Sequence, residues 1–245
     1  MTGSSYQLND DDIQYLSLLL GIIDAQNWEA FGYTILNSPT EFQSFARKIC
    51  QSTELNGMTI LHACVRFNPP PHIIKVLLQL VPESPTCIDC LQRTPLHIAA
   101  GTRASSPIIK LLVDAYPTSC EIRDIDGKTP LHLACDSACE LFEGDRESDA
   151  REPPQFDVVR TLAKASPLSV PLEDQDGMSA LEHAIFSDAP IVVIQLLQYA
   201  TRRQCETQQK EQEASVIPAI IVPVRRGVFS RRKGDILENG NFFHA

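Results

Sequence analysis

The sequence has few aromatic residues and no long hydrophobic run. Its longest apolar stretches, Leu16–Ile23 and Val216–Val224, are far shorter than the roughly 20 residues that a membrane-spanning helix needs. The N-terminal segment MTGSSYQLNDDD lacks the basic start and apolar core of a secretory signal peptide. We therefore expect no transmembrane segment, and an intracellular location, in the cytoplasm rather than in the nucleus.

Motifs of catalysis and cofactor binding are also lacking. The sequence has no Gly-rich phosphate loop, no Gly-x-Ser-x-Gly elbow, and no Cys–His pair with an orienting acid. Cys87 and Cys90 form a Cys-x-x-Cys motif, but no second pair follows at the spacing of a zinc site. The eight cysteines are expected to be small buried apolar side chains in a reducing compartment. The sequence predicts a protein that is not an enzyme and has no cofactor, metal or small-molecule substrate. A zinc or redox role of Cys87 and Cys90 is an alternative.

The charge is unevenly distributed. Acidic residues outnumber basic ones by 31 to 21 overall, but the segment from Thr201 onward has a basic excess. An acidic body argues against a broad nucleic-acid footprint, which needs a basic face. The basic tail keeps open an alternative function, a nuclear regulator whose tail directs import or contacts nucleic acid. Its basic cluster comprises Arg225, Arg226, Arg231, Arg232 and Lys233.

What the sequence does contain is a repeat. The segments GMTILHACV, RTPLHIAAG and GKTPLHLAC are followed by a degraded fourth copy, GMSALEHAI. Their Thr or Ser anchors are separated by 35, 35 and 50 residues, and they are Thr59, Thr94, Thr129 and Ser179. A second apolar segment starts at Ile73, Ile108 and Val158, again 35 and then 50 residues apart. Two sequence patterns in the same register establish the repeat.

Each unit predicts a turn followed by two helices. Asn or Asp beside Gly favours a tight turn, the anchor hydroxyl caps a helix, and Pro fits its first position. The second segment has the apolar spacing of another helix and ends in Pro. Since one unit cannot bury both helices alone, the units are expected to stack on a shared core.

The motif Thr-Pro-Leu-His-x-Ala at Thr94–Ala99 and Thr129–Ala134 resembles the ankyrin repeat. The resemblance implies an all-α solenoid of stacked helix-turn-helix units with short β-turn or hairpin connections. Four repeats are expected over residues 52–206, at about 54–88, 89–123, 124–173 and 174–206. Residues 1–51 are predicted to form a helical cap, and residues 207–245 a disordered tail. In the family, the motif histidines, here His62, His97 and His132, are structural.

Two segments depart from the repeat. In the cap, Ile13, Leu16, Leu20 and Ile23 follow helical spacing, and SPTE at Ser38–Glu41 predicts the start of another helix. The interval of 50 contains an acidic insertion near residues 138–155. This insertion is either a tolerated mobile loop or a partner-specific acidic loop.

The resemblance also implies that a partner meets the turn tips and the exposed sides of the first helices, which form a concave groove. We therefore predict a non-catalytic interaction module, an adaptor, scaffold or regulatory subunit, that binds another protein of unknown identity. Counting from the anchors places these residues in the groove: Leu55, Met58, Arg66, Phe67, Leu91, Arg93, Ile125, Asp126, Lys128, Asp136, Gln175, Met178 and Phe186. Several of them are apolar, which is typical of an interface rather than a solvated surface.

Overall fold

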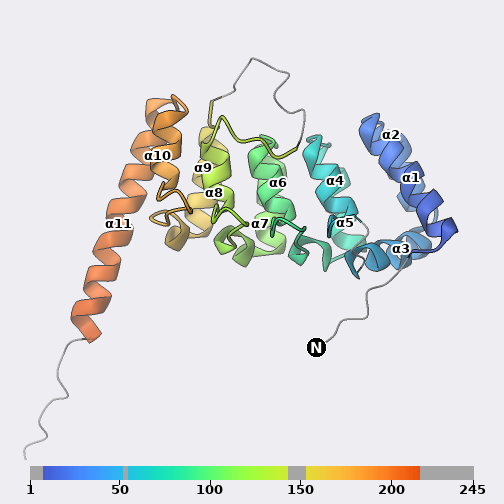
Figure 1. The fold of residues 1–245 in the computed structure, drawn as a ribbon, viewed down its shortest axis with the longest axis horizontal. Coiled ribbons are helices and arrows are strands. Elements are labelled where there is room, and N and C mark those ends of the chain that lie inside the picture. The colour runs from blue at the N-terminus through green and yellow to red at the C-terminus, as the bar shows by residue number, and fades with distance from the viewer. Residues whose placement is uncertain (1–7, 52–54, 143–152, 216–245) are drawn as a thin grey trace, which may run out of the picture.

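The computed structural model describes residues 8–51, 55–142 and 153–215 (Figure 1). These residues form helices and turns without a strand, and their one isolated antiparallel bridge joins Glu173 to Ser179. This confirms the predicted all-α solenoid. The basic cluster of the tail and the centre of the acidic insertion lie outside the described residues.

Three helices precede the repeats: α1 (Asp10–Asp24), α2 (Trp28–Asn37) and α3 (Pro39–Gln51). They lie at one end of the stack, with α3 against the first repeat (Figure 1). Leu16, Leu19 and Ile23 form the buried face of α1. The prediction that Ile13 belongs to this face is wrong, because Ile13 is half exposed. The buried face of α1 is rotated relative to the predicted one and includes Leu19.

Four helix pairs follow, each starting at a repeat anchor. The first helices form one layer and the second helices another, and each helix packs on its counterpart in the next repeat. The pairs are α4 (Ile60–Arg66) with α5 (Pro71–Leu80), α6 (Pro95–Gly101) with α7 (Ser106–Ala115), α8 (Pro130–Cys135) with α9 (Phe156–Ala165), and α10 (Ala180–Phe186) with α11 (Ile191–Ser215). We call the surface formed by the turns before α4, α6, α8 and α10 and the exposed sides of these helices the inner face.

Small residues and prolines fix the geometry of the stack. Ala99, Ala134 and Ala184 are buried between first helices and let them approach closely. The helices α7 and α9 end two residues before Pro117 and Pro167, because proline cannot donate the next helical hydrogen bond. Each of these prolines then starts a short 3₁₀ turn, η2 (Pro117–Glu121) or η4 (Pro167–Ser169).

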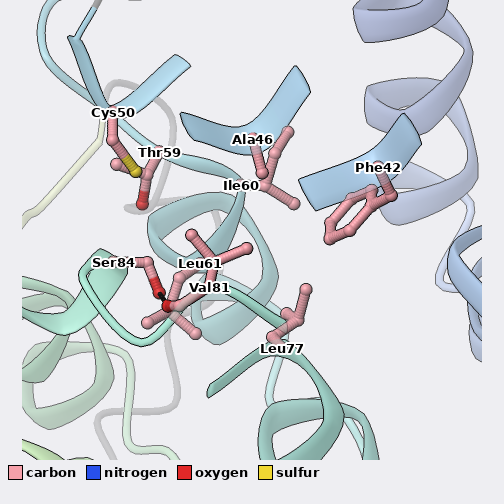
Figure 2. Close-up of a pocket in the computed structure, with 9 residues that line it drawn as sticks. All are labelled: Phe42, Ala46, Cys50, Thr59, Ile60, Leu61, Leu77, Val81 and Ser84. Atoms are coloured by element: carbon pink, nitrogen blue, oxygen red, sulfur yellow. Dashed lines mark hydrogen bonds between the residues drawn. The ribbon is translucent and has the colours of Figure 1, made fainter. Parts of the chain in front are cut away.

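The interface between α3 and the first repeat is apolar. Phe42 and Ala46 of α3 lie opposite Ile60 and Leu61 of α4 (Figure 2). The gap between these side chains has a volume of about 10 Å³, enough for about one water molecule. Ligand pockets are larger by more than an order of magnitude, so this gap is a packing defect between cap and repeat.

The last helix, α11, continues to Ser215, nine residues beyond the boundary expected at residue 206. Its final turns, RQCETQQKEQEAS, contain few apolar residues and therefore show no amphipathic period. They are rich in Glu, Gln and Lys, which have high intrinsic helix propensity. Figure 1 shows this helix extending past the stack.

Candidate protein-binding surface

The turn tips of the inner face are held by a repeated aspartate. In three turns an aspartate Oδ1 accepts hydrogen bonds from the backbone N–H groups two and four residues later. These aspartates are Asp89, Asp124 and Asp174, and they are buried. They are separated by the same 35 and 50 residues as the anchors. The sequence therefore contains a periodic signal for them, although they were not among the predicted groove residues.

Adjacent turns are also joined to one another. The backbone N–H of Ile125 donates to the carbonyl oxygen of Leu91 at 2.9 Å, and the N–H of Gln175 donates to that of Asp126 at 3.0 Å. The second of these bonds connects repeats three and four across the interval of 50 residues. The turns therefore form a continuous edge, and the insertion leaves their spacing unchanged.

The motif histidines fix each turn to its helix and to the next turn or the segment that leads into it. In repeat one, the backbone N–H of Thr59 donates to His62 Nδ1 at 3.1 Å. Nδ1 is therefore an acceptor, and Nε2 carries the proton and donates to the carbonyl oxygen of Arg93 at 3.0 Å. His97 and His132 repeat the pattern, with Nε2 donating to the carbonyl oxygens of Ile122 and Leu172.

Burial keeps these histidines neutral. Desolvation lowers the pKa of His62, His97 and His132 to about 4 in each case. Both ring nitrogens are already engaged in the hydrogen bonds that hold the turns. These side chains are structural, as the family resemblance implies.

Repeat four replaces the motif histidine with a carboxylate. Oε2 of Glu182 accepts hydrogen bonds from the N–H and the hydroxyl of Ser179 at 2.7 and 2.8 Å, and these lower the pKa of Glu182. The neighbouring His183 is buried, and its Nε2 lies 2.7 Å from Oδ2 of Asp174. The ring of His183 packs edge-on against His132 of repeat three.

Several predicted groove residues are exposed and apolar. Leu91 and Ile125, on hydrogen-bonded neighbouring turns, are 38% and 47% exposed, and Phe186 at the end of α10 is 79% exposed. Asp126 and Gln175 are exposed polar residues beside them. Ile88, which was not among the predicted groove residues, is also half exposed. Leu55, Met58, Phe67 and Met178 are half-buried.

The structure corrects the expectation for Arg93. This residue is only 6% exposed, and its Nε lies 2.7 Å from Oδ2 of Asp89. Arg93 is buried because the side chain lies along the inner face under residues of the insertion rather than extending into solvent. Leu55 and Phe67 pack partly against the hydrophobic core. Lys128 and Asp136 pair with each other at 2.9 Å, and their ion pair raises the pKa of Lys128 against the opposing effect of burial.

The insertion begins on the inner face itself. Residues Asp136–Phe142 leave α8 and run across the end of α6 toward α4 (Figure 1). The backbone N–H of Ser137 donates to the hydroxyl of Ser187 at 2.8 Å. This part of the insertion is therefore packed on the repeats.

Neither a metal site nor a membrane span is found among the described residues. No group of three or more His, Cys, Asp and Glu side chains in this part of the chain is arranged to hold a metal ion. Cys90 is exposed and Cys87 half-buried. Within residues 8–51, 55–142 and 153–215, no helix combines the length and apolar character needed to cross a membrane.

Stacked helix pairs joined through a continuous edge of turns define a helical repeat protein. Residues 61–144 match the family model of ankyrin repeats, in three copies. The chain therefore contains ankyrin repeats, and such repeats are generally protein–protein interaction modules that typically have no catalytic activity. No curated protein matches the sequence.

Proposed function

We propose that this protein is a non-catalytic adaptor, scaffold or regulatory subunit that binds a protein partner through its inner face. The proposal is supported above all by the exposed apolar side chains of Leu91 and Ile125 on adjoining turn tips. Exposed apolar groups that lie together, with polar neighbours around them, are typical of an interface.

The rigidity of these turns supports the same function. The aspartate bonds of Asp89 and Asp124 and the bond between the two turns hold Leu91 and Ile125 in place before binding. A partner therefore does not have to order the surface that it contacts, which lowers the entropic cost of binding. Phe186, on the same inner face in repeat four, extends the surface along the stack.

The test is a quantitative pulldown from extract of the native cell, analysed by mass spectrometry. We expect wild-type protein to retain a partner that a Leu91→Glu, Ile125→Glu variant loses, because each change places a charge in the apolar contact. Photo-crosslinking groups at positions 91 and 125 are expected to label the same partner directly.

Leu18→Glu is the matched control. Leu18 lies on α1 of the cap and is somewhat more exposed than the two turn residues, so the change adds a charge of the same sign far from the inner face. Circular dichroism verifies that all variants fold. Retention of the same proteins by the turn variant, the control and the wild type would contradict the proposal.

For the location of the protein, we propose an intracellular compartment, the cytoplasm rather than the nucleus. Cys64 and Cys135 are free and fully buried, where they serve as small apolar side chains, an arrangement that suits a reducing compartment. Imaging of the full chain with a fluorescent tag in its native cell tests this, and a predominantly nuclear signal would contradict it.

A further inference from the structure

Residues Asp136–Phe142, which we call the return segment, contact repeats one and two through two adjacent side chains and two carbonyl groups. The carbonyl oxygen of Asp136 accepts from Arg103 Nη2 at 3.2 Å. Leu141 is buried, and its carbonyl oxygen accepts a hydrogen bond from Arg93 Nη1 at 2.8 Å. Phe142 lies next to two guanidinium groups, with the Cζ atoms of Arg66 and Arg93 3.9 and 5.2 Å from its ring centre. The segment thus reaches from repeat three to repeats two and one.

A missing side chain makes room for Leu141. The position seven residues after the anchor is Arg66, Asp136 or Phe186 in the other repeats, but Gly101 in repeat two. A Cβ atom on Gly101 would lie 2.5 Å from Leu141 Cδ1. The leucine therefore occupies a space that exists only because repeat two has glycine there.

Two arginines beside this space hold the return segment. Arg93 is held by the carboxylate of Asp89, so its Nη1 is fixed toward the main chain of the segment. The half-buried guanidinium of Arg66 provides a flat cation for an aromatic ring. Of the four residues that follow the turns at this register, Met58, Arg93, Lys128 and Met178, only Arg93 is an arginine.

The return segment is suited to exchange with another peptide. Leu141 is one of the two most exposed members of the hydrophobic core, and Cys139 and Phe142 pack partly against that core. Its contacts on repeats one and two include one aliphatic side chain, one ring and the carbonyl groups of Leu141 and Asp136, all of which a short peptide from another chain can supply.

We propose that the return segment is an intramolecular placeholder for an unfolded peptide of the partner protein, in which an aliphatic residue is followed directly by an aromatic one. The aliphatic side chain lies against Gly101, its carbonyl group accepts from Arg93, and the ring lies on Arg66. This inference rests on the proposed function, because it names the chemistry of the partner that the inner face binds.

The test uses the full chain and a fluorescein-labelled peptide with the sequence of residues 137–142, carrying Cys139→Ser to avoid thiol chemistry. Binding is measured by fluorescence anisotropy. In wild-type protein the tethered segment competes at an effective concentration of about a millimolar, so the peptide binds weakly. In a Leu141→Ala, Phe142→Ala variant the site is empty, and we expect the apparent affinity to rise about tenfold.

Two further variants identify the site. Adding Gly101→Ala to the Leu141→Ala, Phe142→Ala variant, which we call the emptied chain, is expected to abolish the tenfold gain in affinity. The new methyl group fills the space of the leucine. Gly101 does not have a positive φ, and alanine favours a helix, so this variant is expected to fold, as thermal denaturation will verify. Arg66→Gln in the same background is expected to weaken binding several-fold, and a peptide with both Leu and Phe replaced by Ala is expected not to bind.

The inference is overturned if the emptied chain binds the peptide no better than wild type, or if Gly101→Ala leaves the gain intact. It is also overturned if wild-type chains exchange this segment with one another, which light scattering would detect as a dimer that the Leu141→Ala, Phe142→Ala variant does not form. Loss of the extract partner by the Leu91→Glu, Ile125→Glu variant, without peptide binding, would preserve the proposed function and refute this inference alone. Peptide binding to the emptied site, without any partner that depends on Leu91 and Ile125, would preserve this inference and refute the proposed binding through the turn tips.

Discussion

Arg93 and Asp89 form a buried ion pair at the second turn, with Nε and Oδ2 2.7 Å apart. The same carboxylate accepts two backbone N–H groups through Oδ1, and the same guanidinium donates to the return segment through Nη1. This ion pair thus connects the second turn to the return segment that lies on the inner face.

Replacing Arg93 with Met is expected to lower the free energy of unfolding by about 3 kcal/mol, because Asp89 is left as a buried carboxylate without its cation. Urea denaturation measures the change. The control is Arg160→Met, which breaks a similar pair with Asp157 on the exposed surface of α9 and is expected to cost less than about 1 kcal/mol. Equal losses in the two variants would contradict the assigned role of the buried pair.

The free energy of unfolding is expected to decrease as the pH is lowered from about 6.5 to 4. The pKa values of His62, His97 and His132 are about 4 in the folded protein and about 6.5 in the unfolded chain, so below pH 6.5 the unfolded state binds more protons. Their stabilising contribution is complete above pH 6.5 and is lost as pH falls toward 4. Each histidine contributes a slope of at most about 1.4 kcal/mol per pH unit.

Urea denaturation at pH 7 and pH 5.5 tests this dependence, and His97→Gln separates it from the titration of carboxylates. Glutamine supplies a donor and an acceptor without titrating, so the variant is expected to lose about one third of the histidine contribution to the slope. An unchanged slope would show that the histidines do not account for the pH dependence.

Two glycines with the same backbone angle are expected to differ in their tolerance of alanine. Gly127 and Gly177 have φ values of +75° and +74°, which cost an L-residue about 1–2 kcal/mol. At Gly127 a Cβ atom would also lie 3.1 Å from the backbone nitrogen of Gln175 in the next turn, whereas at Gly177 nothing lies within 4 Å. Thermal denaturation should show a larger loss for Gly127→Ala than for Gly177→Ala, and the reverse order would contradict the turn packing.

The cap is expected to stabilise the first repeat. Phe42 is fully buried where α3 meets α4, and Phe42→Ala is expected to cost about 3–5 kcal/mol. Tyr33→Ala, an exposed aromatic on α2, is the control and is expected to have little effect. Chemical denaturation monitored by circular dichroism compares them, and similar losses would exclude a stabilising role for the docked cap.

The periodic part of the fold could be predicted from the sequence because it depends on local chemistry that recurs. Thr59, Thr94, Thr129 and Ser179 each precede the first residue of a helix, as their intervals predicted. In α1 the same reasoning was insufficient. Both Leu19 and Leu20 fit an apolar face, and only packing against the other helices selects Leu19.

The surface was less predictable because its burial depends on contacts without a period. Arg93 and Leu141 are 48 residues apart, and no repeat spacing relates them. Counting from the anchors therefore placed Arg93 correctly on the inner face, yet could not show that an inserted segment covers it. Exposed tips such as Leu91 and Ile125 were identified because their position follows from the turn alone.

The hydrogen bonds of the motif histidines all run toward the C-terminal end of the solenoid. The ring of His62 donates forward to Arg93 of repeat two, and the rings of His97 and His132 donate to Ile122 and Leu172, which end their own repeats and lead into the next turn. Glu182 of repeat four keeps both of its bonds within its own turn. This residue therefore acts as a terminator. A consensus repeat grafted after α11 would need histidine at position 182 before it could be accepted as the next unit of the array.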